Sequence, residues 1–231
     1  MKNIIGAHNP HRKLEGRLLG TMLFTKRQEI VDKRILNIGC GFGWFELRAA
    51  KLGAKNITGI EVSESDLKVA KSNIKNSKVN FEVASAIDLP FKDNAFDTVV
   101  IWEVIEHIPK NTEEKMFAEI SRVLKNNGTL LLSTPSRHFL TKILDPAWWL
   151  IGHRHYHASD IVQLSRKHFS IVYYCYKGKW YTVIGLLNMY ISKWIFRREP
   201  FFSEFISEKV SGEYKLNDGF ANLFIRLKNE K

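Results

Sequence analysis

The stretch from Arg34 to Gly43, RILNIGCGFG, decides how this chain folds. Its first half is a short apolar run typical of a buried strand, and its second half holds Gly39, Gly41 and Gly43. A helical pattern follows directly and extends to residue 52. Glycines between a strand and a helix let the backbone approach a ligand closely, and the first helical turn offers free N–H donors. The stretch therefore predicts a strand, a ligand-binding loop and a helix.

The same alternation of short apolar runs and helical stripes continues along the chain. Strands spaced by helices indicate βαβ units, a parallel sheet and right-handed crossovers. The last third is less regular, and an insertion at 179–219 separates its two expected strands. We expect strands at 34–39, 56–62, 79–84, 96–102, 129–133, 170–177 and 221–228, and helices at 43–52, 64–73, 112–124 and 158–168.

An acidic residue stands at the end of the second expected strand. Glu61 follows Gly43 by 18 residues, where a carboxylate can accept hydrogen bonds from both hydroxyls of a bound ribose. Dinucleotide sites use the spacing Gly-x-Gly-x-x-Gly, whereas this loop has Gly-x-Gly-x-Gly. A chain of 231 residues also leaves no room for a separate substrate domain of the dehydrogenase type. A nucleoside without phosphates fits this loop better.

Five motifs follow one another in a fixed order and together resemble one enzyme superfamily. They are ILNIGCGFG at 35–43, GIEVS at 59–63, DLPFKDNAFD at 88–97, EVIEH at 103–107 and LKNNGTLLLS at 124–133. In this order they resemble the class I S-adenosylmethionine-dependent methyltransferases, and most of all the small-molecule branch with the quinone-biosynthesis and sugar or lipid enzymes. The resemblance covers roughly residues 30–177. It implies a Rossmann-like, doubly wound α/β fold with a seven-stranded sheet, mostly parallel with the last strand antiparallel.

The resemblance also implies a cofactor, S-adenosylmethionine, and the residues that hold it. Gly39, Cys40, Gly41 and the adjacent backbone would hold its methionine part. Glu61 would bind the ribose. The backbone around Trp102, at the end of the fourth strand, would line the methionine end.

The adenine side of this implied site departs from the usual pattern. Val62 would pack on the adenine ring. Relatives usually carry an acid four residues before the Leu of Leu-Pro-Phe, where it receives the adenine amino group, and here that position is Ser85. Ser85 and Ala86 are therefore the expected contacts. The nearby Asp88 is the alternative, reaching in from the loop.

Histidines supply the candidates for proton removal at the methyl acceptor. His107 follows the fourth strand on the carboxyl side of the sheet, where ligands bind. The tract GHRHYH at 152–157 resembles a segment that lies over the substrate pocket in relatives, so His153, His155 and Tyr156 are further candidates. A packing role for His107 and a plain basic loop at 152–157 stay open. No carboxylate–His pattern completes a metal site, so we expect no metal.

Charge and apolar patches bear on the partner. The net charge is +11, and it lies in the flanks: residues 1–34 hold 8 basic and 3 acidic side chains, and 151–231 hold 13 and 7. Two aromatic-rich apolar patches occupy 139–151 and 180–196. The second is too short and too polar to span a membrane. A lid over an apolar substrate, a dimer face and an interfacial membrane helix remain open.

We therefore expect an N-terminal basic helical segment at 1–33 and a methyltransferase domain at 34–231, with insertions at about 135–157 and 179–219, the latter forming a helical lid. The expected reaction is methyl transfer to a small, hydrophobic or lipid-linked acceptor. The basic flanks keep an RNA or protein methyltransferase as the alternative, although nucleic acid is not the expected partner. Two cysteines and no leading apolar run favour a cytoplasmic location, with peripheral membrane contact and oligomerisation left open.

Overall fold

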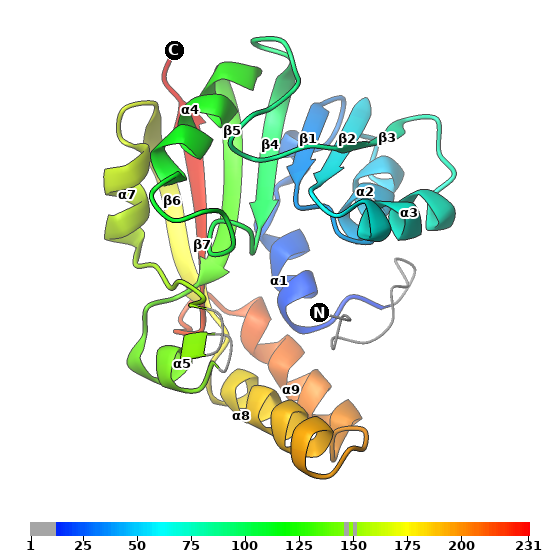
Figure 1. Cartoon of the computed structure of the whole chain (residues 1–231), viewed down its shortest axis with the longest axis vertical. Helices are drawn as coiled ribbons and strands as arrows, with labels where there is room; N and C mark the ends of the chain where they lie inside the picture. Colours follow the sequence, from blue (N-terminus) through cyan, green and yellow to red (C-terminus); the bar gives the residue numbers. More distant parts are fainter. Residues whose placement is uncertain (1–12, 146–147, 150–151) are drawn as a thin grey trace.

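A seven-stranded sheet forms the centre of the molecule (Figure 1). This computed structural model describes residues 13–145, 148–149 and 152–231. The strand order is β3-β2-β1-β4-β5-β7-β6, and β7 runs antiparallel to both of its neighbours. The expected fold class is confirmed. The strands are β1 (Arg34–Ile38), β2 (Asn56–Glu61), β3 (Val79–Val83), β4 (Phe96–Trp102), β5 (Leu124–Pro135), β6 (Phe169–Lys177) and β7 (Asn222–Asn229).

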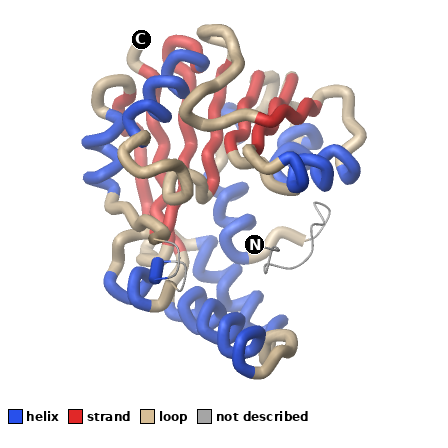
Figure 2. The backbone as a smooth tube through the Cα atoms, viewed as in Figure 1, coloured by secondary structure: helices blue, strands red, loops and turns tan. Residues whose placement is uncertain are grey.

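Helices cover both faces of this sheet, as Figure 2 shows. Successive residues of a strand point to opposite faces. Leu36 of β1 therefore packs with the side chains of α4 and α7, whereas Ile35 packs with those of α1 and α2. The two layers bury the apolar runs that the sequence shows. The helices are α1 (Gly16–Phe24), α2 (Trp44–Lys51), α3 (Glu64–Asn73), α4 (Glu113–Val123), α5 (Phe139–Ile143), α7 (Ala158–Ser165), α8 (Trp180–Tyr190) and α9 (Ser203–Lys215).

Four of these helices gather at one end of the sheet. In Figure 1, α1, α5, α8 and α9 lie below the carboxyl ends of β1, β4 and β5. Helix α9 packs against both α1 and α8. Ligands of open α/β sheets bind outside the carboxyl ends of the strands. The N-terminal segment and the insertions therefore surround the edge where a ligand is expected.

The late insertion is a helical hairpin. Helix α8 continues into a π-type turn at Ile191–Ile195, and α9 returns toward the sheet. One carboxylate joins the two helices: Glu213 of α9 accepts hydrogen bonds from the backbone N–H groups of Lys179, Tyr181 and Thr182 at 2.7–2.9 Å. These amides begin α8 and would otherwise lack partners. The helical character of 180–196 is as expected, whereas α9 was not predicted.

Strand β5 is longer than expected. It begins at Leu124 rather than at Thr129, because Leu124 pairs with Phe96 before a register shift in β4. Of the expected N-terminal segment, residues 1–12 lie outside the described part of the chain, and the remainder holds α1 and a short 3-10 turn, Arg27–Glu29. Within the described residues, no helix combines the length and the apolar character needed to cross a membrane.

Candidate active site

The loop after β1 has the backbone shape that the three glycines predict. Gly39, Gly41 and Gly43 have φ angles of +74°, +52° and +85°. A Cβ at Gly39 would collide with the side chain of Val104. The N–H groups of Gly39 and Cys40 both donate to the carbonyl oxygen of β2 residue Ile60, at 2.8 and 3.0 Å. A Cβ at Gly41 would meet nothing within 4 Å, so this part of the loop borders open space.

Glu61 reaches the glycine loop from the end of β2. Its Oε2 accepts a hydrogen bond from the Gly41 N–H at 3.3 Å, and its Oε1 accepts one from the Val62 N–H at 2.9 Å. The side chain of Val62 is 69% exposed beside it. The structure therefore brings together the residues predicted to hold the ribose and the adenine ring.

The predicted adenine contacts form a turn beside Glu61. The N–H of Ala84 donates to the Glu61 carbonyl oxygen at 3.2 Å, which places the following residues next to the loop. The Asp88 N–H donates to the Ser85 carbonyl oxygen at 3.2 Å and closes the turn. Ala86 is buried in the core, so it could reach a ligand only through its backbone, whereas Asp88 is exposed.

The Trp102 side chain lies in the core, whereas its neighbour Glu103 lies at the site. The Trp102 ring is buried against Phe45 and Phe224, so its contribution to a ligand site is limited to its backbone. Glu103 has an unusual φ of +57°. Its carboxylate accepts hydrogen bonds from Ser133 Oγ and Arg17 Nη1 at 2.7 Å, and from Asn222 Nδ2 at 3.0 Å, so three segments distant in the sequence meet at Glu103. Glu103 opens the motif EVIEH, and its position in the sequence alone does not indicate this role.

A buried acid supports the loop from below. Glu46 of α2 is fully buried and accepts a hydrogen bond from Asn37 Nδ2 at 2.7 Å. Burial raises its pKa to about 7. Burial likewise raises the pKa of the Cys40 thiol, beyond the range in which a thiolate forms readily. Cys40 therefore contributes its backbone to the loop and not a reactive sulfur.

Two of the predicted histidines meet at the carboxyl end of β4. His107 Nε2 and His153 Nε2 are 3.4 Å apart, and the two ring centres are separated by 4.6 Å. His153 Nδ1 is 2.6 Å from Asp145 Oδ2, and His155 Nε2 is 3.4 Å from the same oxygen. Desolvation lowers the pKa of His107, and the neighbouring His153 lowers it further. Desolvation also lowers the pKa of His155, so both rings favour the neutral form.

Tyr156 is held in the core. Its hydroxyl donates to Glu113 Oε1 at 3.1 Å, and the residue is 7% exposed. Burial raises its pKa above the usual value. Arg154 makes an ion pair with the same Glu113. Tyr156 therefore orders the segment that carries His153 and His155, and its hydroxyl is engaged by the protein.

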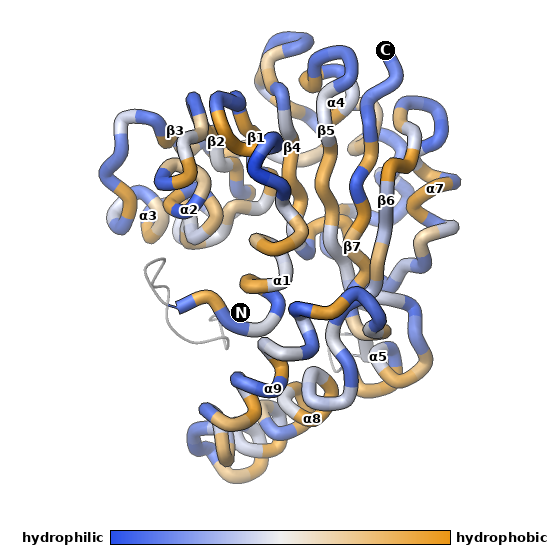
Figure 3. The backbone as a smooth tube through the Cα atoms, turned by 180° about the vertical axis from the view of Figure 1, so that it is seen from behind, coloured by the Kyte–Doolittle hydropathy of each residue, from blue (hydrophilic) through white to orange (hydrophobic). Residues whose placement is uncertain are grey.

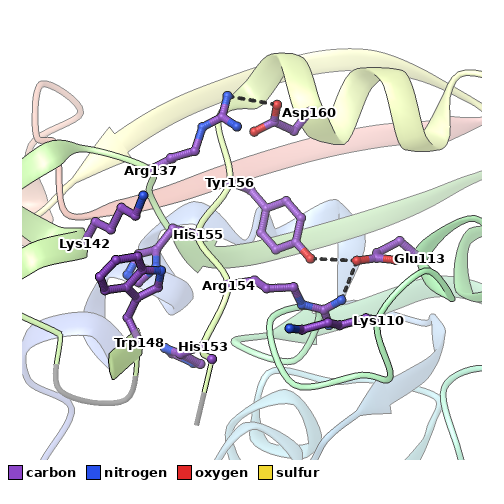
Figure 4. Close-up of a pocket in the computed structure, with 11 residues that line it drawn as sticks. Lys110, Glu113, Arg137, Lys142, Trp148, His153, Arg154, His155, Tyr156 and Asp160 are labelled. Carbon is purple, nitrogen blue, oxygen red and sulfur yellow. Dashed lines mark hydrogen bonds and ion pairs between the residues drawn. The ribbon is translucent and has the colours of Figure 1, made fainter. Parts of the chain in front are cut away.

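A cavity of about 420 Å³ opens beside the histidines. Figure 4 shows Arg137, Lys142 and Trp148 on one side of it and Glu113 with Arg154 on the other. Its cationic groups outnumber its acidic ones. The lining residues are Lys110, Glu113, Arg137, Lys142, Trp148, Gly152, His153, Arg154, His155, Tyr156 and Asp160.

Comparisons with known proteins agree with this arrangement. Residues 36–132 match a family described as "Methyltransferase domain". This part of the chain is therefore similar to methyltransferase domains. The matched segment extends from β1 into β5 and so includes the glycine loop, Glu61, the Ser85 turn and His107.

Curated relatives match this same part of the chain. The ubiquinone biosynthesis O-methyltransferase of Xanthomonas euvesicatoria pv. vesicatoria is 35% identical over 114 residues, which are 48% of this chain and 46% of that protein. Ajmaline N-methyltransferase of Rauvolfia serpentina is 33% identical over 113 residues, 47% of this chain and 38% of that protein. The chain thus spans less than half the length of the curated relatives that it matches.

The fold extends beyond the matched segment. The solved structure of an S-adenosylmethionine-dependent methyltransferase from Mesorhizobium loti has a TM-score of 0.63, with 98% of this chain and 100% of that chain covered. The sequence identity is 15%, so this likeness concerns the fold. The domain and the fold imply S-adenosylmethionine as cofactor. The open space at Gly41 and the position of Glu61 fit such a nucleoside.

Proposed function

We propose that this chain transfers a methyl group from S-adenosylmethionine to a small hydrophobic or lipid-linked acceptor. The observation that carries the methyl-transfer part is the contact between the Glu61 carboxylate and the N–H of Gly41. This contact holds the carboxylate that would bind the ribose hydroxyls beside the loop that would hold the methionine part. Preorganised polar groups need little rearrangement when a ligand binds, which favours affinity.

The surface of the α8–α9 hairpin supports an apolar acceptor. Large apolar side chains on it face solvent at the end of the molecule where the ligand edge lies, and Figure 3 shows hydrophobic stretches along this hairpin. Exposed apolar surface of this extent marks contact with a partner or an amphiphilic ligand. The exposed side chains are those of Trp180, Tyr181, Ile184, Ile191, Trp194, Ile195, Phe196, Phe202 and Phe205.

The cavity at the histidines supports a polar or acidic group on the same acceptor. Lys142 lies over the Trp148 ring at 4.6 Å, and Arg137 makes a 3.2 Å ion pair with Asp160. Lys110 contributes a further cation to the cavity wall. A cavity with excess positive charge attracts anions. An acceptor with an apolar body and an acidic or polar end is complementary to both surfaces.

Methyl transfer requires the protein mainly to orient the acceptor, because the cofactor supplies the reactive group. When bound, S-adenosylmethionine supplies an electrophilic methyl group on its sulfonium. The chain must hold the acceptor atom in line with that methyl group and remove a proton where the acceptor carries one. His107 is the candidate base, because it lies at the carboxyl end of β4 with a lowered pKa. A neutral imidazole can accept the proton.

Methyl-labelled S-adenosylmethionine tests the proposal directly. The purified chain is incubated with membrane lipids, soluble metabolites, RNA and protein from an extract of its host cells, and label is counted in each fraction. We expect label in the lipid fraction. Label only in soluble polar metabolites, RNA or protein would contradict the acceptor class, and label only in RNA would favour the alternative raised by the basic flanks.

A matched pair of variants separates the cofactor assignment from the acceptor assignment. Glu61→Ala is expected to lower S-adenosylmethionine affinity at least 100-fold in calorimetry, because the carboxylate partner of the ribose is lost. Glu64→Ala removes a nearby exposed carboxylate and should leave the affinity unchanged. In the described part of the chain this carboxylate forms an ion pair with Lys68 at 3.3 Å. Equal affinities in the two variants would refute the role of Glu61.

A further inference from the structure

Three side chains from two distant segments converge beside the predicted methyl-transfer site. They are Glu106 and His107, which follow β4, and His153, which precedes α7. One ligand-type atom from each lies within 4.8 Å of the other two. His153 Nε2 is 3.4 Å from His107 Nε2 and 4.0 Å from Glu106 Oε1. The carboxylate that the sequence lacked next to its histidines is therefore supplied by the fold.

The Glu106 carboxylate is buried, and one of its two oxygens has no hydrogen-bond partner among the described residues. Glu106 is 4% exposed, and its Oε2 accepts a hydrogen bond from Thr134 Oγ1 at 3.0 Å. Its Oε1 has no hydrogen-bond partner among the residues that the structure describes, and it is the oxygen that faces His153. A buried polar atom without a partner is destabilising unless a ligand satisfies it. This oxygen therefore points to a ligand that is positively charged or donates a hydrogen bond.

Asp145 sets the orientation of the His153 ring. Its Oδ2 lies 2.6 Å from His153 Nδ1, which keeps the proton of a neutral imidazole on Nδ1. The lone pair of Nε2 is then directed at His107 and Glu106. A carboxylate on the far nitrogen of a histidine is the arrangement that orients imidazole ligands in metal sites.

We propose that Glu106, His107 and His153 bind one divalent transition-metal ion, with zinc as the reference case and Asp145 as a positioning residue. Two ligands 2.0–2.1 Å from a tetrahedral ion are about 3.3 Å apart, close to the separation of the two Nε2 atoms. The 4.0 Å between Glu106 and His153 needs a closure of several tenths of an ångström. Two imidazoles and one carboxylate form a set that holds zinc and leaves a coordination position open.

The neighbouring group of Asp145, His153 and His155 fits an ion less well. Its shortest separation, 2.6 Å between Asp145 and His153, is that of a hydrogen bond. Two atoms that share a hydrogen bond cannot both bind one ion until they separate. The geometry therefore assigns Asp145 to orientation of His153 and places the ion on the Nε2 side.

An ion here would have access to solvent and to an acceptor. His107 is exposed, so the cluster opens toward water, and His153 also lines the cavity described above. With the ion bound, His107 is a ligand and no longer the base, and the ion would instead lower the pKa of an acceptor oxygen at the open coordination position; this part of the inference rests on the proposed function. Metal binding itself does not rest on it.

Cobalt(II) is the first probe, because its visible absorption reports coordination by nitrogen and oxygen ligands. The full chain is stripped with a chelator, dialysed and titrated with cobalt, then with zinc in competition. We expect one ion per chain and displacement of cobalt by zinc. Magnesium prefers oxygen ligands and is expected to compete poorly.

Four variants test the ligand assignment. Glu106→Gln keeps the side-chain shape and the Thr134 contact, and His153→Gln removes the shared imidazole; each is expected to weaken cobalt binding at least 100-fold. Asp145→Asn is expected to weaken it about 10-fold with the stoichiometry retained. His168→Gln, directly before β6, is the matched control and should bind as the parent does. Circular dichroism and S-adenosylmethionine binding confirm that each variant is folded.

The outcomes separate this inference from the proposed function. No stoichiometric ion, or cobalt affinity unchanged in both Glu106→Gln and His153→Gln, would overturn the metal site whatever the methylation result. Stoichiometric binding lost in these two variants would support it even where no acceptor is methylated. Chelator-sensitive methyl transfer restored by zinc would further support contact between the ion and the acceptor, and chelator-insensitive transfer by the metal-free chain would overturn that contact.

Discussion

The cofactor side and the acceptor side of this molecule are built in different ways. On the cofactor side, backbone hydrogen bonds link Gly39 and Cys40 to Ile60 and Ala84 to Glu61, and the Glu61 carboxylate accepts from the Gly41 N–H. On the acceptor side, His107 and His153 are held by side chains from separate loops. Backbone pairing transmits the geometry of the sheet directly to the site. Side-chain contacts between loops depend instead on the packing of every segment that carries them.

The largest expected effect is on the cofactor side, from Gly39→Ala. The added Cβ would strike Val104 and would require an unfavourable positive φ. We expect S-adenosylmethionine affinity to fall at least 100-fold in calorimetry, because the loop must move away from Ile60. Gly53→Ala is the control, since its φ is also positive at +96° but its Cβ meets nothing within 4 Å. It should lose a little stability and keep its affinity; a similar loss of affinity in both variants would contradict the argument.

The buried carboxyl group of Glu46 predicts that the difference in unfolding free energy between Glu46→Gln and the parent changes with pH by about 3 kcal/mol. The folded pKa of Glu46 is about 7, above the ordinary value of 4.5. The unfolded chain therefore releases this proton between about pH 4.5 and 7 while the folded chain retains it, so the folded state loses relative stability as pH rises through that window. Denaturant unfolding of Glu46→Gln should match the parent near pH 4.5 and exceed its stability by up to about 3 kcal/mol at pH 8.

The exposed acid Glu64 provides the comparison for Glu46. Glu64→Gln should show no such window, because its side chain is 72% exposed. A constant difference between Glu46→Gln and the parent at all pH values would show that packing, and not ionisation, distinguishes the two proteins.

Glu213→Ala tests whether the α8–α9 hairpin can unfold locally while the rest of the molecule stays folded. The variant removes the acceptor of three backbone N–H groups at the start of α8. We expect the unfolding free energy of the hairpin to fall by about 2 kcal/mol, seen as faster amide hydrogen exchange across 179–216. S-adenosylmethionine affinity should change less than threefold. Glu208→Ala on the exposed surface of α9 should leave exchange unchanged, and equal acceleration in β1 and β2 would show that the two sides are one cooperative unit.

The smallest expected effect on stability comes from Ile195→Ser. This side chain is 69% exposed, so its loss should change the unfolding free energy by less than about 0.5 kcal/mol. With an amphiphilic acceptor, KM should rise severalfold while kcat stays constant, because only apolar contact is removed. Val172→Thr on edge strand β6, 51% exposed, is the matched control. An unchanged KM for Ile195→Ser would argue that the hairpin surface serves another partner.

Local chemistry explains why the sequence predicted the cofactor side. The loop glycines, Glu61 and the strand boundaries of β2 and β4 follow from short-range patterns of burial and backbone conformation. Because parallel strands end at one edge, residues at those ends meet without any knowledge of loop structure. The assignment of Ser85 came instead from the resemblance to relatives and stays a prediction; the structure places Ser85 in a turn that follows the contact between Ala84 and Glu61.

The sequence by itself determined the α/β sheet, the glycine loop and the carboxylate opposite it, because each depends on neighbours along the chain or on strand order. Only the tertiary structure decided that Glu103 accepts hydrogen bonds from Arg17 and Asn222. It likewise decided that α9 returns to pack on α1 and that Glu106 faces His153. These contacts join segments separated by dozens of residues through side chains whose directions depend on loop packing. Periodicity and motif spacing carry no information about such directions.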